Sequence, residues 1–155
     1  MLLTSIGQPH MHELFRYIHI LTSIAFLLFA ISLITRSIIG ISKHKAYTGV
    51  DRFLAYATII TLYVQLFLGV FLFTNYGPLS GNQFQEVADN ARLASNRLWP
   101  IQHIVLMFFA LMIATLGLIL SAKSKVDRDK HKKILIYYVI AILIIAQSLC
   151  AIYIF

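Results

Sequence analysis

The chain has 155 residues, of which 59% are hydrophobic and only 12% are charged, and its formal net charge is +7. A soluble core cannot hide so many apolar side chains in so short a chain, because small proteins bury a limited share of their surface. The composition therefore excludes an ordinary soluble domain and favours lipid as the solvent. The apolar runs are continuous rather than alternating, so we expect an all-α fold and not a β-barrel.

Four stretches are long enough to cross a bilayer, which needs about 20 apolar residues. They run from about 14 to 34, 53 to 73, 101 to 120 and 134 to 155. We expect a single domain, an integral membrane four-helix bundle whose helices run up-down-up-down. The N-terminal flank lacks the basic region and cleavage site of a signal peptide, so the first span is expected to be retained.

The distribution of Lys and Arg predicts the orientation. Ten of the thirteen lie in the connection before the second span or in the connection before the fourth. By the positive-inside rule these two loops are cytoplasmic, and both chain termini lie outside. The orientation in the membrane thus explains the positive net charge, and a nucleic-acid partner is the weaker explanation. The KSKVDRDKHKK segment could also contact anionic lipid.

The middle connection, residues 74–100, is the longest. Residues 84–95 have a weak helical pattern, which predicts a short helix along the outer interface. Trp99 fits an interfacial aromatic anchor, and Pro100 fits the first turn of the third helix.

Three spans carry a stripe of polar or small residues at helical spacing, and such groups face the interior of a bundle because lipid cannot solvate them. The stripes are His12, Arg16, His19 and Ser23 in the first span; Thr58, Thr61, Gln65 and Gly69 in the second; and His103, Met107, Ala110, Ala114, Gly117 and Ser121 in the third.

The first and third helices run in the same direction and are diagonal partners in such a bundle, so His103 can meet His12 or His19 near the outer surface. Two facing imidazoles suit a low-spin b-type haem, which needs two axial nitrogens and an apolar slot. The small residues after His103 would give the macrocycle room, and Arg16 could pair with a propionate.

Other interpretations of the same residues remain open. Arg16 and His19 could snorkel to the interface, and the small stripe could pack helices without any ligand. His10, His12 and His103 could instead hold a zinc or copper ion at the outer face.

Two further histidines, His44 and His131, are flanked by lysines in the basic loops. Neighbouring cations disfavour a metal ion there, so we interpret both as solvated loop histidines.

Several short motifs together resemble one family. They are His12-Glu13-Leu14-Phe15-Arg16-Tyr17; Lys45-Ala46-Tyr47-Thr48 with Asp51; Gln65 with Gly69; Gln102-His103 with Met107 and Gly117; and Lys130-His131-Lys132-Lys133. This pattern is similar to that of small bacterial four-helix membrane proteins usually labelled "cytochrome B". The resemblance covers nearly the whole chain, although His19 has no counterpart in it and Tyr63 stands where a histidine is common.

The resemblance implies a bacterial cytoplasmic (inner) membrane protein with His12 and His103 as candidate axial ligands of haem b. With the stripes, it predicts a b-type cytochrome-like electron carrier, with His19 as the substitute for His12 and with quinol or other respiratory complex subunits as partners. The alternative is a non-catalytic accessory or assembly subunit of a larger respiratory membrane complex. No constellation for a stand-alone enzyme is present in the sequence.

Overall fold

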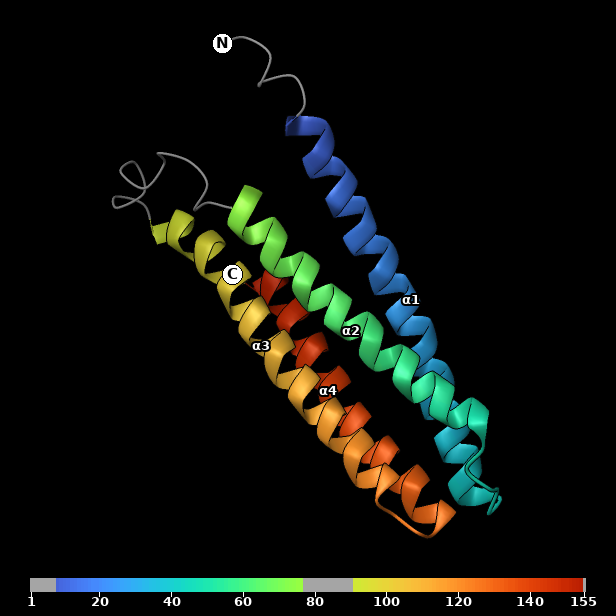
Figure 1. Ribbon diagram of the computed structural model, residues 1–155. Helices are drawn as coiled ribbons and strands as arrows, with labels where there is room; N and C mark the ends of the chain where they lie inside the picture. Colours follow the sequence, from blue (N-terminus) through green and yellow to red (C-terminus); the bar gives the residue numbers. More distant parts are fainter. Residues whose placement is uncertain (1–7, 77–90, 155) are drawn as a thin grey trace.

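The computed structural model describes residues 8–76 and 91–154, and it describes the side chains of residues 11, 13–75 and 101–150. The described chain forms four α-helices in the order α1 (Gln8–Ser42), α2 (Gly49–Tyr76), α3 (Ala91–Ala122) and α4 (Asp127–Ile154). They lie alongside one another as an elongated bundle (Figure 1).

All four helices are long and apolar enough to cross a membrane, which is the character of a multi-pass membrane protein. The candidate spans are Glu13–Ser42, Gly49–Asn75, Ile101–Ala122 and Asp127–Cys150. Even the shortest of them, at about 1.5 Å per residue, exceeds the hydrocarbon thickness of about 30 Å. The four predicted spans are thereby confirmed as apolar helices.

The helices are arranged as two closely packed pairs. The contacts are most extensive between α3 and α4 and between α1 and α2, followed by those of α1 with α4 and of α2 with α3. This order of neighbours makes α1 and α3 diagonal partners, as predicted. Figure 1 shows the two short connections at the same end of the bundle, which we call the loop end, and it shows α1 diverging from the other helices away from that end.

A turn with a left-handed residue joins α1 to α2. His44 has a φ of 50°, and the next residue, Lys45, donates its backbone N–H to the carbonyl of Gly40 at 3.1 Å. This six-residue closure is the Schellman form of helix ending. The next helix begins with a capping box, since Asp51 accepts hydrogen bonds from both the backbone N–H and the hydroxyl of Thr48, at 2.8 and 2.7 Å.

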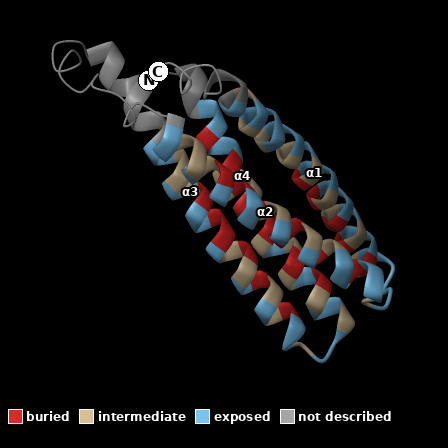
Figure 2. Cartoon of the chain, turned by 45° about the horizontal axis from the view of Figure 1, so that its top comes forward, coloured by how far each residue is buried: buried red, intermediate tan, exposed pale blue. Residues whose placement is uncertain are grey.

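The core is a thin apolar seam between the helices, and many large aliphatic residues are exposed. Figure 2 shows buried and exposed residues recurring along the helices. Alanines recur among the larger residues of the seam, and small residues allow helix backbones to approach closely in a membrane. Its fully buried members include Ala30, Leu33, Ala55, Leu62, Ala110, Ala114, Ile134 and Tyr138.

Helix α3 begins earlier than the sequence predicted. It starts at Ala91, so residues 91–95 belong to α3, and Pro100 lies inside the helix rather than in its first turn. A proline is tolerated inside a membrane helix when the backbone groups that it frees are satisfied locally. The remainder of the predicted interfacial helix, residues 84–90, lies outside the described residues.

Candidate functional site

His19 and His103 line the same cavity, in the half of the bundle that lies away from the loop end. The cavity has a volume of about 240 Å³ and takes side chains from all four helices. Its lining consists of His19, Ser23, Phe26, Leu27, Gln65, His103, Met107, Ile145 and Leu149. Apart from the two imidazoles, the serine and the glutamine, these are apolar groups.

His103 comes from α3 and is held by α4. Its Nδ1 lies 2.6 Å from the hydroxyl oxygen of Ser148, which is buried. When Nδ1 carries the ring proton and donates it to this hydroxyl, Nε2 is the nitrogen with a lone pair for a ligand. Such a bond fixes the tautomer and the ring orientation, as partners of metal-ligating histidines commonly do. The Ser148 contribution was not foreseen from the sequence.

His19 enters the same cavity from α1, the helix diagonally opposite α3. Its Nδ1 is buried and has no hydrogen-bond partner among the described residues. A buried imidazole nitrogen without a partner costs about 1–3 kcal/mol. A ligand bound in the cavity would remove that cost.

Gln65 ties α2 to α1 beside the cavity. Its Nε2 donates to the carbonyl oxygen of His19 at 2.9 Å and to the hydroxyl oxygen of Ser23 at 2.6 Å. Gln65 is 3% exposed, and its Oε1 has no partner among the described residues. The amide therefore sets the position of the α1 segment that carries His19.

The two other predicted site residues of α1 are His12 and Arg16. The His12 side chain lies outside the described side chains, while the α1 backbone places it about 10 Å along the helix from His19. The Arg16 guanidinium pairs with the carboxylate of Glu13 at 3.0 Å, and its side chain is 52% exposed. Arg16 is not among the residues that line the cavity.

The expectation that the small stripe of α3 gives a macrocycle room is wrong for most of its length. A Cβ on Gly117 would collide with Tyr137 of α4, and Ser121 donates its hydroxyl to the backbone carbonyl of Lys130 at 3.2 Å. Ala110 and Ala114 are buried in the core. The stripe is thus used for close helix packing, the alternative that the sequence left open.

The side chains that line the cavity are of the kinds that bind a bis-histidine haem, but the volume of the cavity is small for one. Two imidazoles, one of them oriented by a serine, lie in an apolar slot, which is the donor set that a b-type haem needs. The volume of about 240 Å³ is below the ~300–1,000 Å³ of typical ligand pockets, so a macrocycle would require α1 to move outward. Within the described part of the chain, no three His, Cys, Asp or Glu side chains gather as a metal-ion site. His10 and His12, the proposed zinc or copper ligands with His103, have side chains outside that part.

Sequence reasoning missed the environment of His131. The residue lies in α4 and is 2% exposed, so its interpretation as a solvated loop histidine is wrong, whereas His44 is exposed as predicted. It is buried because α1 continues to Ser42 and lays Gly40 against its ring. A signal was present: the buried stripe of α4 begins at this residue and continues through Ile134, Tyr138, Ala141, Ile145 and Ser148.

Tyr47 covers another side of the His131 ring. The two rings meet edge to face, with centroids 5.1 Å apart and an interplanar angle of 63°. The pKa of the Tyr47 phenol is raised above its ordinary value, mainly because the side chain is buried. The phenol therefore stays neutral at physiological pH. Tyr47 thus acts as a neutral packing partner of the imidazole.

The chain matches no protein-family model. Neither a curated protein nor a solved structure is significantly similar to it.

Proposed function

We propose that this protein is a b-type cytochrome-like membrane protein that holds one haem between His19 and His103 and takes part in respiratory electron transfer. The observation that carries the proposal is the convergence of these two histidines, from diagonal helices, on one apolar cavity. A haem bound there would supply one-electron transfer, and the protein would tune it through ligand identity, hydrogen bonding and burial.

Each residue has a distinct role in this proposal. His103 would be one axial ligand through Nε2, with Ser148 holding its Nδ1–H. His19 takes precedence over His12 as the second ligand, because it lines the cavity and has a buried nitrogen without a partner among the described residues. Arg16 would neutralise a propionate, but it already pairs with Glu13 and does not line the cavity, so its contribution is expected to be minor.

The proposed orientation follows from charge. Most of the Lys and Arg residues lie in or beside the two short connections, which supports a cytoplasmic loop end by the positive-inside rule. The helices would then run up-down-up-down with both termini outside, and the haem would lie nearer the outer leaflet of a bacterial cytoplasmic membrane. Its partners would be a quinol or other subunits of a respiratory complex, as the likeness to the proteins labelled "cytochrome B" implies.

A second function, that of a non-catalytic accessory or assembly subunit, is favoured by one observation. Gln65 fills the interior and bonds to α1, and the cavity beside it is small. A subunit of this kind needs only a closed core and apolar outer faces.

A difference spectrum separates the two functions. The full chain is purified in detergent from haem-replete cells, and the dithionite-reduced minus air-oxidised spectrum is recorded with haem quantified per chain. A sharp reduced α-band with about one haem per chain is expected from bis-histidine ligation. A colourless protein would exclude the cytochrome function and leave the accessory subunit.

Three histidine variants then locate the ligands. We expect His103→Ala and His19→Ala each to lose most of the haem, because each would remove one axial nitrogen. His44→Ala serves as the matched control, since His44 is an exposed loop residue at the far end of the bundle and should keep full haem content. If His12→Ala loses the haem and His19→Ala keeps it, the second ligand is His12.

A further inference from the structure

A second cavity lies at the loop end, far from the cavity of His19 and His103. Its volume is about 460 Å³, within the range of ligand-binding pockets. It is formed where the last turns of α1 and the α1–α2 connection meet the start of α2 and α4. Its lining includes Arg36, Gly40, Lys45, Thr48, Asp51 and His131.

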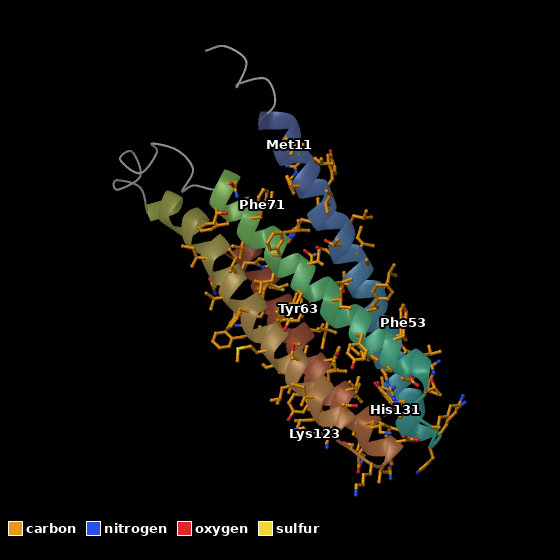
Figure 3. The ribbon with its side chains drawn as sticks, viewed as in Figure 1. Met11, Phe53, Tyr63, Phe71, Lys123 and His131 are labelled. Atoms are coloured by element: carbon orange, nitrogen blue, oxygen red, sulfur yellow. The ribbon has the colours of Figure 1, made fainter. Side chains whose placement is uncertain are left out.

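His131 is the buried polar group of this cavity. Figure 3 shows it at the loop end, on α4. Although the residue is 2% exposed, neither Nδ1 nor Nε2 has a hydrogen-bond partner among the described residues. An imidazole always has at least one N–H to donate, and leaving that N–H buried and unpaired is unfavourable. A bound group that accepts a hydrogen bond would satisfy it.

The packing around His131 holds the ring at the cavity wall. A Cβ on Gly40 would lie closer than 3.0 Å to three atoms of the imidazole, so the ring rests directly on the α1 backbone. Tyr47 packs edge-on against it. The backbone bond from Lys45 to Gly40 brings the connection, and with it the Lys45 ammonium, to the same cavity. The site is therefore assembled by packing that involves α1, the connection and α4.

Charge decides which kind of acceptor is favoured. Arg36 and Asp51 neutralise each other in an ion pair, which leaves the Lys45 ammonium as the uncompensated charge of the lining. The surrounding loop end is strongly cationic: it carries Lys43, Arg52, Lys123, Lys125, Arg128, Lys130, Lys132 and Lys133 against Asp127 and Asp129. A cation is repelled from such a site and an anion is attracted.

We propose that this cavity binds the phosphate of an anionic phospholipid headgroup from the leaflet at the loop end, with His131, Lys45 and Arg36 as its donors. A basic pocket between transmembrane helices on the positively charged side of a protein is the usual form of such a lipid site. Arg36 can contribute while it stays paired with Asp51, because its two bonds to the carboxylate use Nε and Nη2 and leave Nη1 for another acceptor. The apolar side chain of Ile39 in the lining suits the glycerol and first acyl carbons. This proposal does not depend on haem binding.

Native mass spectrometry of the full chain in a neutral detergent tests the proposal. Phosphatidylglycerol and phosphatidylcholine are titrated separately, and the dissociation constant of the first bound lipid is measured. We expect phosphatidylglycerol to bind about tenfold more tightly, a difference of about 1.4 kcal/mol. Inorganic phosphate at millimolar concentration should not displace it, because free phosphate lacks the apolar part of the ligand.

Two variants and one control assign the binding to this cavity. Lys45→Gln removes a cation from an exposed connection without touching the core, and His131→Phe keeps a ring on Gly40 but removes both nitrogens. Each should weaken phosphatidylglycerol binding about tenfold. The control, Lys125→Gln, makes the same charge change at an exposed residue of the other connection, outside the cavity, and should change the binding less than about threefold.

Three outcomes would overturn the proposal. The first is equal affinity for the two lipids, and the second is a Lys45→Gln protein that binds phosphatidylglycerol as tightly as the Lys125→Gln control does. The third is displacement by inorganic phosphate, which would assign the cavity to a soluble phosphate and not to a lipid. Lys45→Gln keeps the test decisive even if His131→Phe fails to fold.

Discussion

Arg36 of α1 and Asp51 of α2 form a two-point ion pair, in which Nε donates to Oδ1 at 2.6 Å and Nη2 donates to Oδ2 at 3.2 Å. The carboxylate side chain is 2% exposed, and it also caps the start of α2 through Thr48. The Asp51 side chain therefore binds both the end region of α1, through Arg36, and the start of α2, through Thr48. By its place in the sequence Arg36 belongs to the basic stretch before the second span, whereas the structure includes it in α1.

Asp51→Asn should lower the free energy of unfolding by about 2 kcal/mol, because it leaves the Arg36 cation without its buried counter-ion. The loss is below that of a fully buried pair, since the arginine is 42% exposed. Unfolding in mixed micelles of neutral and denaturing detergent measures it. Asp129→Asn, at an exposed acid of the other turn, is the control and should change stability by less than about 0.5 kcal/mol. Equal effects of the two variants would contradict a specific role for the pair.

Gly40→Ala should destabilise the protein by about 1–3 kcal/mol, because the added methyl group overlaps the His131 ring and the neighbours must shift. Gly49→Ala is the matched control, since nothing lies within 4 Å of its Cβ position, and it should have little effect. The thermal unfolding midpoint of each purified variant reports the difference. Adding His131→Ala to Gly40→Ala should restore part of the loss; no restoration would mean that the strain lies elsewhere.

Gln65→Leu should lower stability by about 1–3 kcal/mol, because the carbonyl of His19 and the hydroxyl of Ser23 each lose a donor. If haem is bound, the same substitution should also reduce haem content, since Gln65 positions the α1 segment that carries His19. Unfolding and haem quantification are measured on the same samples. Gln147→Leu, at an exposed position of α4, controls for the polarity change and should leave both quantities unaltered.

Tyr138→Phe should cost about 1 kcal/mol. The buried Tyr138 hydroxyl donates to the backbone carbonyl of Ala55 at 3.0 Å, which ties α4 to α2 across the bundle. Chemical or thermal unfolding in detergent checks the value. The comparison is Tyr56→Phe, which removes a hydroxyl from a side chain that is 48% exposed and should be nearly neutral. A similar loss in both variants would show that the cross-bundle bond contributes nothing of its own.

The inward faces of the second and third spans could be predicted from the sequence, whereas in the first span Arg16 is exposed. Thr58, Gln65, Met107 and Ser121 are buried as their helical spacing indicated. The reason is that lipid penalises an outward polar group so strongly that spacing alone selects the face. Histidines near helix ends follow no such rule, because an imidazole can be hydrated, packed or bound to a ligand at similar cost.

Apolar run length and the placement of lysine and arginine determined the four helices, because the bilayer fixes the length of a span and disfavours charge inside it. The tertiary structure alone decided which groups meet. It paired Arg36 with Asp51, set Ser148 against His103, used the small stripe of α3 to pack against α4, and buried His131 on Gly40. These contacts depend on where α1 ends and how the helices rotate against one another. Helix ends and rotations are set by packing between distant segments, so the pattern within one helix does not tell which residue of another helix it meets.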